Sequence, residues 1–262
     1  MLIALDTATE WCTAGLSSTD LKNMLTVSRR VGTGHSAYLL PMLDGLIQQR
    51  ATTMSAITGI VVTVGPGSFT GLRIACGVAH GLALSQNLPV VPLSTLEVIA
   101  QRFKGHAVPT VVCLDARMDE LYCGVFDADG VRLMDDFVAK PGDVNARVLS
   151  LLNSSWFNAV GNGWALAATQ NTAMFKLVDR CEKDAYPLAA DMLNLGAKQL
   201  RLRSGYANDG VRNARWSAED ALPVYIRNNV ALDMAAQRQL RFANDQIKLQ
   251  ELGVQTIKGM VP

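Results

Sequence analysis

Two glycine-rich turns and two aspartates are the features of this sequence whose residue types and spacing could do chemistry. The turns are Gly65-Pro66-Gly67 and Gly161-Asn162-Gly163, and each follows a short apolar run. Such a turn at the start of a helix presents backbone N–H groups and the positive end of the helix dipole to an anion. Asp6 and Asp115 end two other apolar runs, where a carboxylate could hold a Mg²⁺–phosphate group. The candidate contacts for a nucleotide or phosphate are therefore Asp6, Gly65, Gly67, Ser68 and Asp115.

Each of these features also has a structural interpretation. The first turn lacks the Gly-Lys-Ser/Thr of a Walker A loop, and its glycines at 65, 67 and 71 do not have the spacing of a dinucleotide-binding fingerprint. It could be a purely structural turn. Asp115 is followed two residues later by Arg117, so the pair could form a local salt-bridged turn instead of a ligand site.

The histidines and cysteines favour neither a metal site nor nucleophilic catalysis. His35, His80 and His106 have no ligand-like spacing, and the five cysteines contain no C-x-x-C pair. No Gly-x-Ser-x-Gly elbow is present. We therefore expect no catalytic residue, no metal ligand and buried thiols of the kind found in a reducing compartment.

Net charge and hydropathy place the chain in the cytoplasm with no large nucleic-acid surface. The formal net charge is +1, no apolar run reaches the length of a membrane span, and the first residues lack the charged region of a signal peptide. Five basic residues and one acid lie between Lys198 and Arg215. A solvated face is the simpler interpretation of that segment, with an RNA-phosphate contact as the alternative.

Charged residues are scarce in the first part of the chain. Residues 1–100 hold 10 of the 47 Asp, Glu, Lys and Arg, and only Asp44, Arg50 and Arg73 lie between Val31 and Leu96. This scarcity indicates either a small lobe that is mostly core or a lobe with a large face covered by a partner.

The helix expected after Ser68 is apolar on every side. Gly71, Ala75, Ala79 and Ala83 form a stripe of small residues, and a bulky stripe of Ile74, Val78 and Leu82 lies beside it. We expect the bulky stripe to face a sheet and the small stripe to face a helix of a partner chain. Leu39, Leu43 and Leu46, on the helix expected after Ser36, would flank that contact.

The order of motifs repeats along the chain. Leu114-Asp115 follows Leu5-Asp6 by 109 positions, and each strand-turn-helix unit recurs in the same order. Two halves of the type β-β-β-α-β-α predict two α/β lobes that face each other across a cleft. We place the first, partner-binding lobe at residues 1–105, the second lobe at 106–228 and a polar, weakly helical tail at 229–262. A late helix is expected at Ala189–Arg203, and a last strand or extended arm at Leu222–Arg227.

These motifs closely resemble those of the TsaB (YeaZ) family of bacterial tRNA threonylcarbamoyladenosine biosynthesis proteins. The resemblance covers residues 1 to about 229 and rests on Leu5-Asp6-Thr7-Ala8-Thr9, His35-Ser36, Leu39-Leu40-Pro41, Gly65-Pro66-Gly67-Ser68-Phe69-Thr70-Gly71-Leu72-Arg73, Leu114-Asp115-Ala116-Arg117-Met118 and Pro223-Val224-Tyr225-Ile226-Arg227.

The resemblance implies two duplicated RNase-H-like lobes of the actin/Hsp70/sugar-kinase (ASKHA) type. It also implies a role beside the catalytic relative TsaD and the ATPase TsaE, which together transfer a threonylcarbamoyl group to the adenosine next to the anticodon. The catalytic relative carries a metal-binding H-x-x-x-H, and Thr95 and Ile99 stand at the matching positions here. Because neither can replace a histidine ligand, the chain is expected to be non-catalytic, and the older description of the superfamily as glycoproteases is set aside.

The function expected from the sequence is therefore that of a scaffold subunit that binds and supports TsaD together with TsaE. The chain is expected to form a homodimer when alone, to contact tRNA weakly or indirectly and to hold no intrinsic cofactor; any ATP or ADP would lie at a shared interface. The alternative is a stand-alone actin-like ATPase or phosphotransferase, which Asp6, Asp115 and the two glycine turns would serve.

Overall fold

The structure is a computed structural model that describes residues 1–166, 174–204 and 216–227. Residues 1–226 form one compact unit. The tail predicted at 229–262 lies outside the described residues. Within the described part of the chain, every helix is too short or too polar to cross a bilayer.

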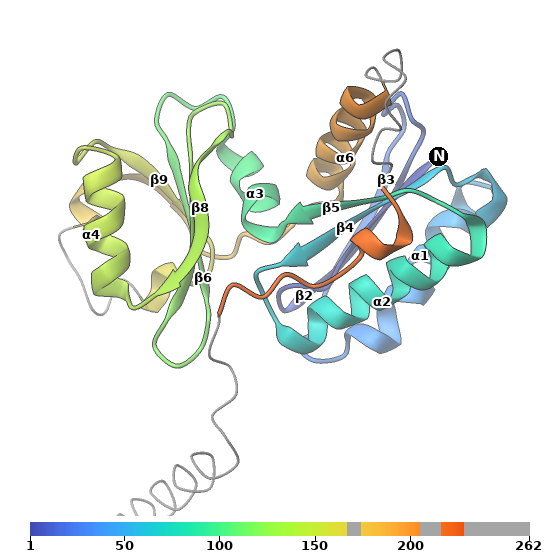
Figure 1. The fold of residues 1–262 in the computed structure, drawn as a ribbon, viewed down its shortest axis with the longest axis horizontal. Helices are drawn as coiled ribbons and strands as arrows, with labels where there is room; N and C mark the ends of the chain where they lie inside the picture. Colours follow the sequence, from blue (N-terminus) through green and yellow to red (C-terminus); the bar gives the residue numbers. More distant parts are fainter. Residues whose placement is uncertain (167–173, 205–215, 228–262) are drawn as a thin grey trace, which may run out of the picture. The chain divides into compact units, whose positions relative to one another are not determined.

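The first sheet has five strands in the order β3-β2-β1-β4-β5 (Figure 1). Its strands are β1 (Leu2–Asp6), β2 (Trp11–Ser17), β3 (Leu25–Arg30), β4 (Gly59–Gly65) and β5 (Val90–Ser94). β1 pairs with β2 antiparallel and with β4 parallel. The hairpin β1–β2–β3 thus leads into a parallel part of the sheet that ends at the glycine-rich turn.

The second sheet repeats this arrangement. Its strands are β6 (Thr110–Asp115), β7 (Leu121–Phe126), β8 (Arg132–Ala139), β9 (Phe157–Val160) and β10 (Val178–Glu182), in the order β10-β9-β6-β7-β8. Read from β8, the order β8-β7-β6-β9-β10 matches the order β3-β2-β1-β4-β5 of the first sheet. The matching topology confirms the duplicated α/β lobes predicted from the repeated motifs, and each sheet ends in a fifth, parallel strand, β5 or β10.

The helices are α1 (His35–Gln49), α2 (Phe69–Gln86), α3 (Thr95–Ala100), α4 (Pro141–Leu151) and α6 (Ala189–Ser204), with short 3₁₀ turns at Met54–Ala56, Gln101–Phe103, Met174–Leu177 and Ala218–Asp220, the last called η4. Ser68 caps α2 through its side chain, which accepts a hydrogen bond from Gly71 N. α2 ends at Asn87, whose left-handed φ of 50° stops the helix.

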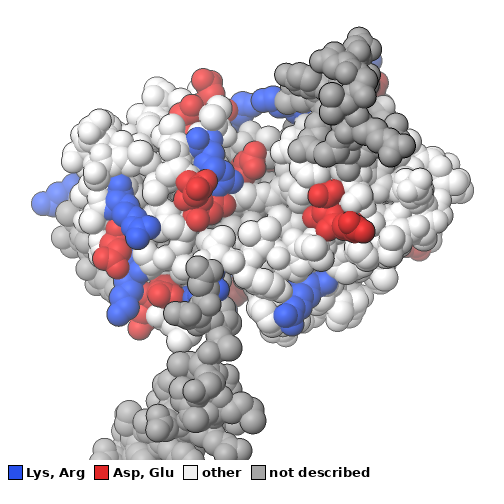
Figure 2. All heavy atoms as spheres, in the orientation of Figure 1, with Lys and Arg blue, Asp and Glu red and all other residues white. Residues whose placement is uncertain are grey.

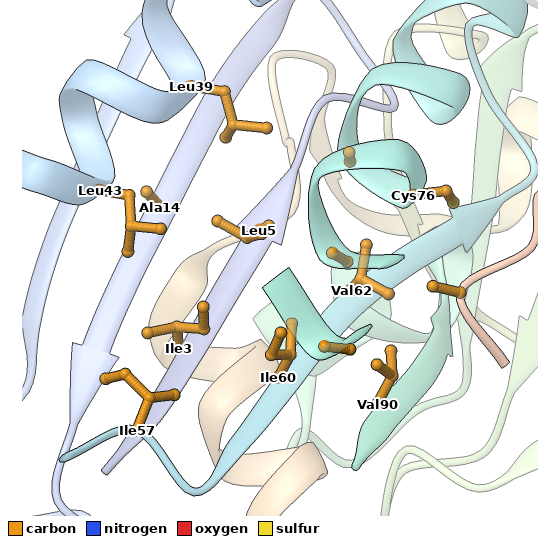
Figure 3. Close-up of a cluster of buried hydrophobic side chains, with 14 of the residues drawn as sticks. Ile3, Leu5, Ala14, Leu39, Leu43, Ile57, Ile60, Val62, Cys76 and Val90 are labelled. Carbon is orange, nitrogen blue, oxygen red and sulfur yellow. The ribbon is translucent and has the colours of Figure 1, made fainter. Parts of the chain in front are cut away.

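Alternate residues of β1 belong to two core clusters, one on each face of the first sheet. Ile3 and Leu5 belong to one core cluster with α1 and α2, whereas Leu2 and Ala4 belong to another with α6. Figure 3 shows Leu39 and Leu43 of α1 and Cys76 of α2 above the strands in the first of these clusters. α1 and α2 therefore cover one face of the first sheet, and α6 covers the other (Figure 1).

The last described helix of each half packs on the sheet of the other half. α3 packs against β6 and β7 of the second sheet, with Leu96 and Ile99 in one cluster with Val112 and Leu114. α6 packs on the first sheet, although the predicted boundary at residues 105 and 106 assigns it to the second lobe. The boundary itself stays a prediction, and each of these two helices packs on a sheet formed by the other half of the chain.

Candidate functional site

The loop from β4 to α2 is hydrogen-bonded to the turn that follows β1. Ser68 N donates to Ala8 O at 2.7 Å, and Thr7 Oγ1 donates to Gly71 O at 2.6 Å. Gly65 has a φ of +126°, which residues with a side chain rarely adopt. The loop N–H of Ser68 that a phosphate would need is therefore already paired with the turn that follows β1.

The glycines of this loop are required by close approach of the backbone. A Cβ at Gly67 would collide with Ala8 O, and one at Gly71 would collide with Thr7 O. A Cβ at Gly65 would lie 2.6 Å from Val224 O. These contacts support the structural interpretation of the turn over the phosphate contact predicted for Gly65, Gly67 and Ser68.

Asp6, which the sequence offered as a nucleotide or phosphate contact, is completely buried in the structure. Its Oδ1 accepts hydrogen bonds from Thr63 Oγ1 and from Ala8 N, the latter at 3.1 Å. Burial raises the pKa of the Asp6 carboxyl to about 7, although both hydrogen bonds act in the opposite direction. A carboxyl held in this way joins β1, β4 and the following turn, and its contact with a nucleotide or phosphate stays a prediction.

The second glycine turn is packed in the same manner. Gly163 N donates to Cys113 O at 2.9 Å, and Asn162 Oδ1 accepts from Asp115 N at 3.0 Å. Asp115 accepts from Arg117 N at 2.7 Å and pairs with the Arg117 guanidinium at 3.2 Å. This is the local salt-bridged turn that the sequence left open, and phosphate contact by the partly exposed Asp115 stays a prediction.

The small stripe of α2 faces its own sheet, which corrects the predicted orientation of the helix. Ala75, Ala79 and Ala83 are at most 1% exposed and belong to one cluster with Ile60 and Val62 of β4. Small side chains let α2 lie close to the strand that precedes it. The stripe, with Gly71 against Thr7 O, is not available to a partner.

The three leucines predicted to flank a partner are also core residues. Leu39, Leu43 and Leu46 of α1 are all under 5% exposed and pack in the same cluster as the small stripe of α2. Their spacing correctly identified one face of α1. That face covers the first sheet, so the outer surface of α1 and α2 is made by other residues.

The outer surface of α1 and α2 is apolar, and it contains glycines at positions where a side chain would fit within this chain. Gly77 and Gly81 are exposed, and an added Cβ would meet no atom within 4 Å at either position. Leu40 and Leu84 are 50% and 64% exposed, and Ile74, Val78 and Leu82 are half-buried beside the two glycines. In Figure 2, uncharged atoms surround the few charged side chains over α2 and its neighbours. We call this surface, formed by Leu40, Gly45, Ile74, Gly77, Val78, Gly81 and Leu84, the outer helical face.

The sequence signal for this face is a pair of glycines that lies outside the stripe of small residues. Gly77 and Gly81 stand four residues apart in the middle of α2, where each glycine costs about 1 kcal/mol of helix stability relative to alanine. Such a cost at an exposed position is explained when another backbone must come close. Alanines can serve either a sheet or a partner, whereas two exposed glycines one turn apart in mid-helix fit a partner backbone better than the sheet beneath.

The two positions that match the histidine pair of the catalytic relative are buried in the core. Thr95 and Ile99 lie one turn apart on α3 and are 0% and 2% exposed. Across the described ranges, no group of three or more His, Cys, Asp or Glu side chains is placed to hold a metal ion. His35 Nε2 contacts Thr9 O at 2.8 Å, and His80 Nδ1 contacts Ala218 O at 2.8 Å, which gives both rings structural roles.

Comparison with known proteins connects this geometry to tRNA modification. Residues 27–233 match the family model described as TsaD, tRNA N6-adenosine threonylcarbamoyltransferase. The tRNA threonylcarbamoyladenosine biosynthesis protein TsaB of Escherichia coli is 32% identical over 88% of this chain and 96% of its own length. The protein of the same name from Haemophilus influenzae is 30% identical over 87% and 94% of the two chains. A crystal structure from Pseudomonas aeruginosa, described as an uncharacterized protein with similarity to peptidase YEAZ, superposes with a TM-score of 0.71 at 30% identity and covers 86% of this chain and 99% of that one.

Proposed function

The chain belongs to the TsaB (YeaZ) family of tRNA threonylcarbamoyladenosine biosynthesis proteins, and from this premise we propose that it is a non-catalytic subunit that binds and supports a TsaD-type catalytic relative. The observation that carries the proposal is the outer helical face. It combines exposed apolar side chains, almost no charge and two exposed helical glycines. A monomer rarely leaves such a surface uncovered.

The occupant of the outer helical face is a pair of helices from the catalytic relative, which belongs to the same duplicated fold. Gly77 and Gly81 let a partner helix approach α2 more closely than the 8–10 Å that larger side chains impose. Without that relative, two copies of the chain pair through the same face, because a two-fold contact closes on itself. A TsaE-type ATPase completes the assembly, and tRNA is contacted weakly or indirectly.

The absence of catalysis is proposed from the residues that occupy the relevant positions. Ile99 has no atom that can bind a metal, and Thr95 is completely buried in the core. A peptidase of the metal-dependent type would need ligands at these two positions, so the peptidase description of the relative from Pseudomonas aeruginosa does not transfer to this chain. The subunit has no cofactor of its own, and any ATP or ADP lies at an interface shared with a partner.

The stand-alone ATPase or phosphotransferase is disfavoured by Asp6 and the first glycine turn. Asp6 is 0% exposed, and Ser68 N is bonded to Ala8 O. An enzyme of that class needs both groups free at the phosphate.

A reconstituted transfer reaction tests the proposal. Threonylcarbamoyl-adenylate and an unmodified tRNA are supplied to the chain alone, to the catalytic relative with its ATPase, and to all three proteins. Product is expected only from the mixture that contains the catalytic relative, with a yield that rises strongly when the chain is added. Turnover by the chain alone, lost on Asp115→Asn, would restore the stand-alone enzyme.

A further inference from the structure

We propose that the extended arm Leu222–Ile226 and the groove beside it form a second docking site, for an extended basic peptide segment of a partner protein. The site lies at the ends of β4 and β5 and shares no residue with the outer helical face. It therefore goes beyond the proposed function, and the two can fail independently.

The arm is held to the first lobe by few contacts. Val224 N donates to Val64 O at 2.7 Å at the end of β4. Among the described residues, no other backbone hydrogen bond joins Leu222–Ile226 to the chain. Successive peptide groups of an extended segment point to opposite edges, so the Tyr225 N–H faces away from β4. An unpaired edge of this kind can accept another extended segment as an added strand.

One side of the arm is anchored, and the other is open. The Tyr225 hydroxyl accepts from Arg73 Nε at 3.0 Å, and the Arg73 guanidinium lies 3.7 Å from the centre of the Phe69 ring. On the opposite side, Leu222 and Val224 are 62% and 51% exposed. The alternation that directs the Tyr225 side chain to Arg73 and Phe69 thus presents the even-numbered apolar side chains to the groove.

The groove is lined mainly by apolar residues of the arm, of β5 and of the glycine-rich loop. Leu222, Val224 and Ile226 form one wall, and Pro92–Ser94 of β5 form part of the other. Val64–Pro66 also line the groove, whose volume is about 410 Å³. β5 is an edge strand of the first sheet, so no further strand of the described chain closes this side.

The charge of the groove selects a cation. Three acids line it, Asp136, Glu219 and Asp220, and none of its lining residues is Lys or Arg. Asp136 accepts from Ser94 Oγ at 2.6 Å and is paired with Arg132, which does not line the groove. Asp220 accepts from Ser217 N at 2.6 Å. The Glu219 carboxylate is exposed and makes no ion pair within the described residues, so it is the group left to bind a basic side chain.

Apolar walls with an acidic rim fit an arginine or lysine whose aliphatic stem packs on Val224 while its charge reaches Glu219. A peptide strand paired with the outer edge of the arm places every second side chain on the groove face. Phosphate groups are excluded by the same charge, which separates this site from any contact with nucleic acid.

The test uses a fluorescent octapeptide of alternating arginine and valine and the full chain, with binding followed by fluorescence polarisation. We expect saturable binding that Glu219→Lys weakens at least tenfold and that Asp179→Lys, the same charge change on exposed β10, leaves within twofold. Alternating glutamate and valine should abolish binding. N-methylation of every second residue of the arginine peptide should also abolish it, because the methyl groups remove the N–H donors of the added strand.

Equal affinity for the glutamate peptide, or no effect of Glu219→Lys, would overturn the proposal. A Glu219→Lys chain that changes its own association state without binding the peptide would assign the groove to a second copy, which also overturns it. Binding of the N-methylated peptide with unchanged affinity would contradict strand pairing. The Glu219→Lys chain should still associate with the TsaD-type relative, because Glu219 lies outside the outer helical face, and a loss there would contradict the independence of the two sites.

Discussion

The Thr63 hydroxyl donates a hydrogen bond to Asp6 Oδ1, and both residues are 0% exposed at the centre of the first sheet. The bond joins β4 to β1 at the point where an enzyme of this architecture would need a free carboxylate. Asp6 Oδ2 has no hydrogen-bond partner within the described residues. The contact therefore marks a structural site with a specific dependence on pH.

Asp6 should make the chain less stable as the pH rises. Burial raises the pKa of its carboxyl from 3.8 to about 7, so the folded state favours the protonated form. The contribution to the free energy of unfolding is complete below about pH 4 and is lost as the pH rises through about 7, a change on the order of a few kcal/mol. Urea unfolding between pH 4 and 8 should show this slope in the natural chain and lose it in Asp6→Asn. An identical slope in both proteins would contradict the assignment.

Gly71→Ala should destabilise the chain severely. The added Cβ would collide with Thr7 O, which is backbone and cannot move without shifting the turn after β1. We expect a loss of more than about 3 kcal/mol of unfolding free energy, the upper part of the range for single substitutions. Gly142→Ala on α4, where a Cβ meets nothing within 4 Å, is the matched control and should stabilise its helix by up to about 1 kcal/mol. Similar melting temperatures for the two variants would contradict the close packing at Thr7.

Ala79→Leu should act on folding and not on association. Ala79 is 0% exposed against the first sheet, and the larger side chain would overpack that contact at a cost of about 1–3 kcal/mol. Differential scanning calorimetry should show earlier melting. Any folded variant should keep its affinity for the catalytic relative, and a loss of affinity at unchanged stability would return the small stripe to the interface.

The sequence was sufficient for the lobes, their duplication and the family. Leu5-Asp6 and Leu114-Asp115 end equivalent strands of two sheets with the same strand order, because local apolar runs and turns determine these elements. The exchange of α3 and α6 between sheets could not be predicted. It depends on which sheet face stays open after the rest of the chain has packed, and that is a property of the tertiary structure.

The site was predicted less well, for a related reason. A stripe of alanines fits a close sheet as well as a close partner helix, and the sequence does not separate the two. Gly77 and Gly81 do separate them, because no internal contact requires their lack of a side chain. The groove beside Val224 could not be found from the sequence, since it depends on a hydrogen bond to Val64, 160 positions earlier.

The affinity of Gly81→Leu for the TsaD-type relative tests the outer helical face most directly. Leucine has a higher helix propensity than glycine, so the isolated variant should melt no earlier than the natural chain. Isothermal titration calorimetry should nevertheless show affinity reduced at least tenfold, because the branched side chain blocks the close approach of the partner helix. Gly142→Leu, the same change at an exposed helical glycine of α4, should bind normally. Unchanged affinity of the Gly81→Leu chain, with both proteins folded, would contradict the proposal that this face holds the partner.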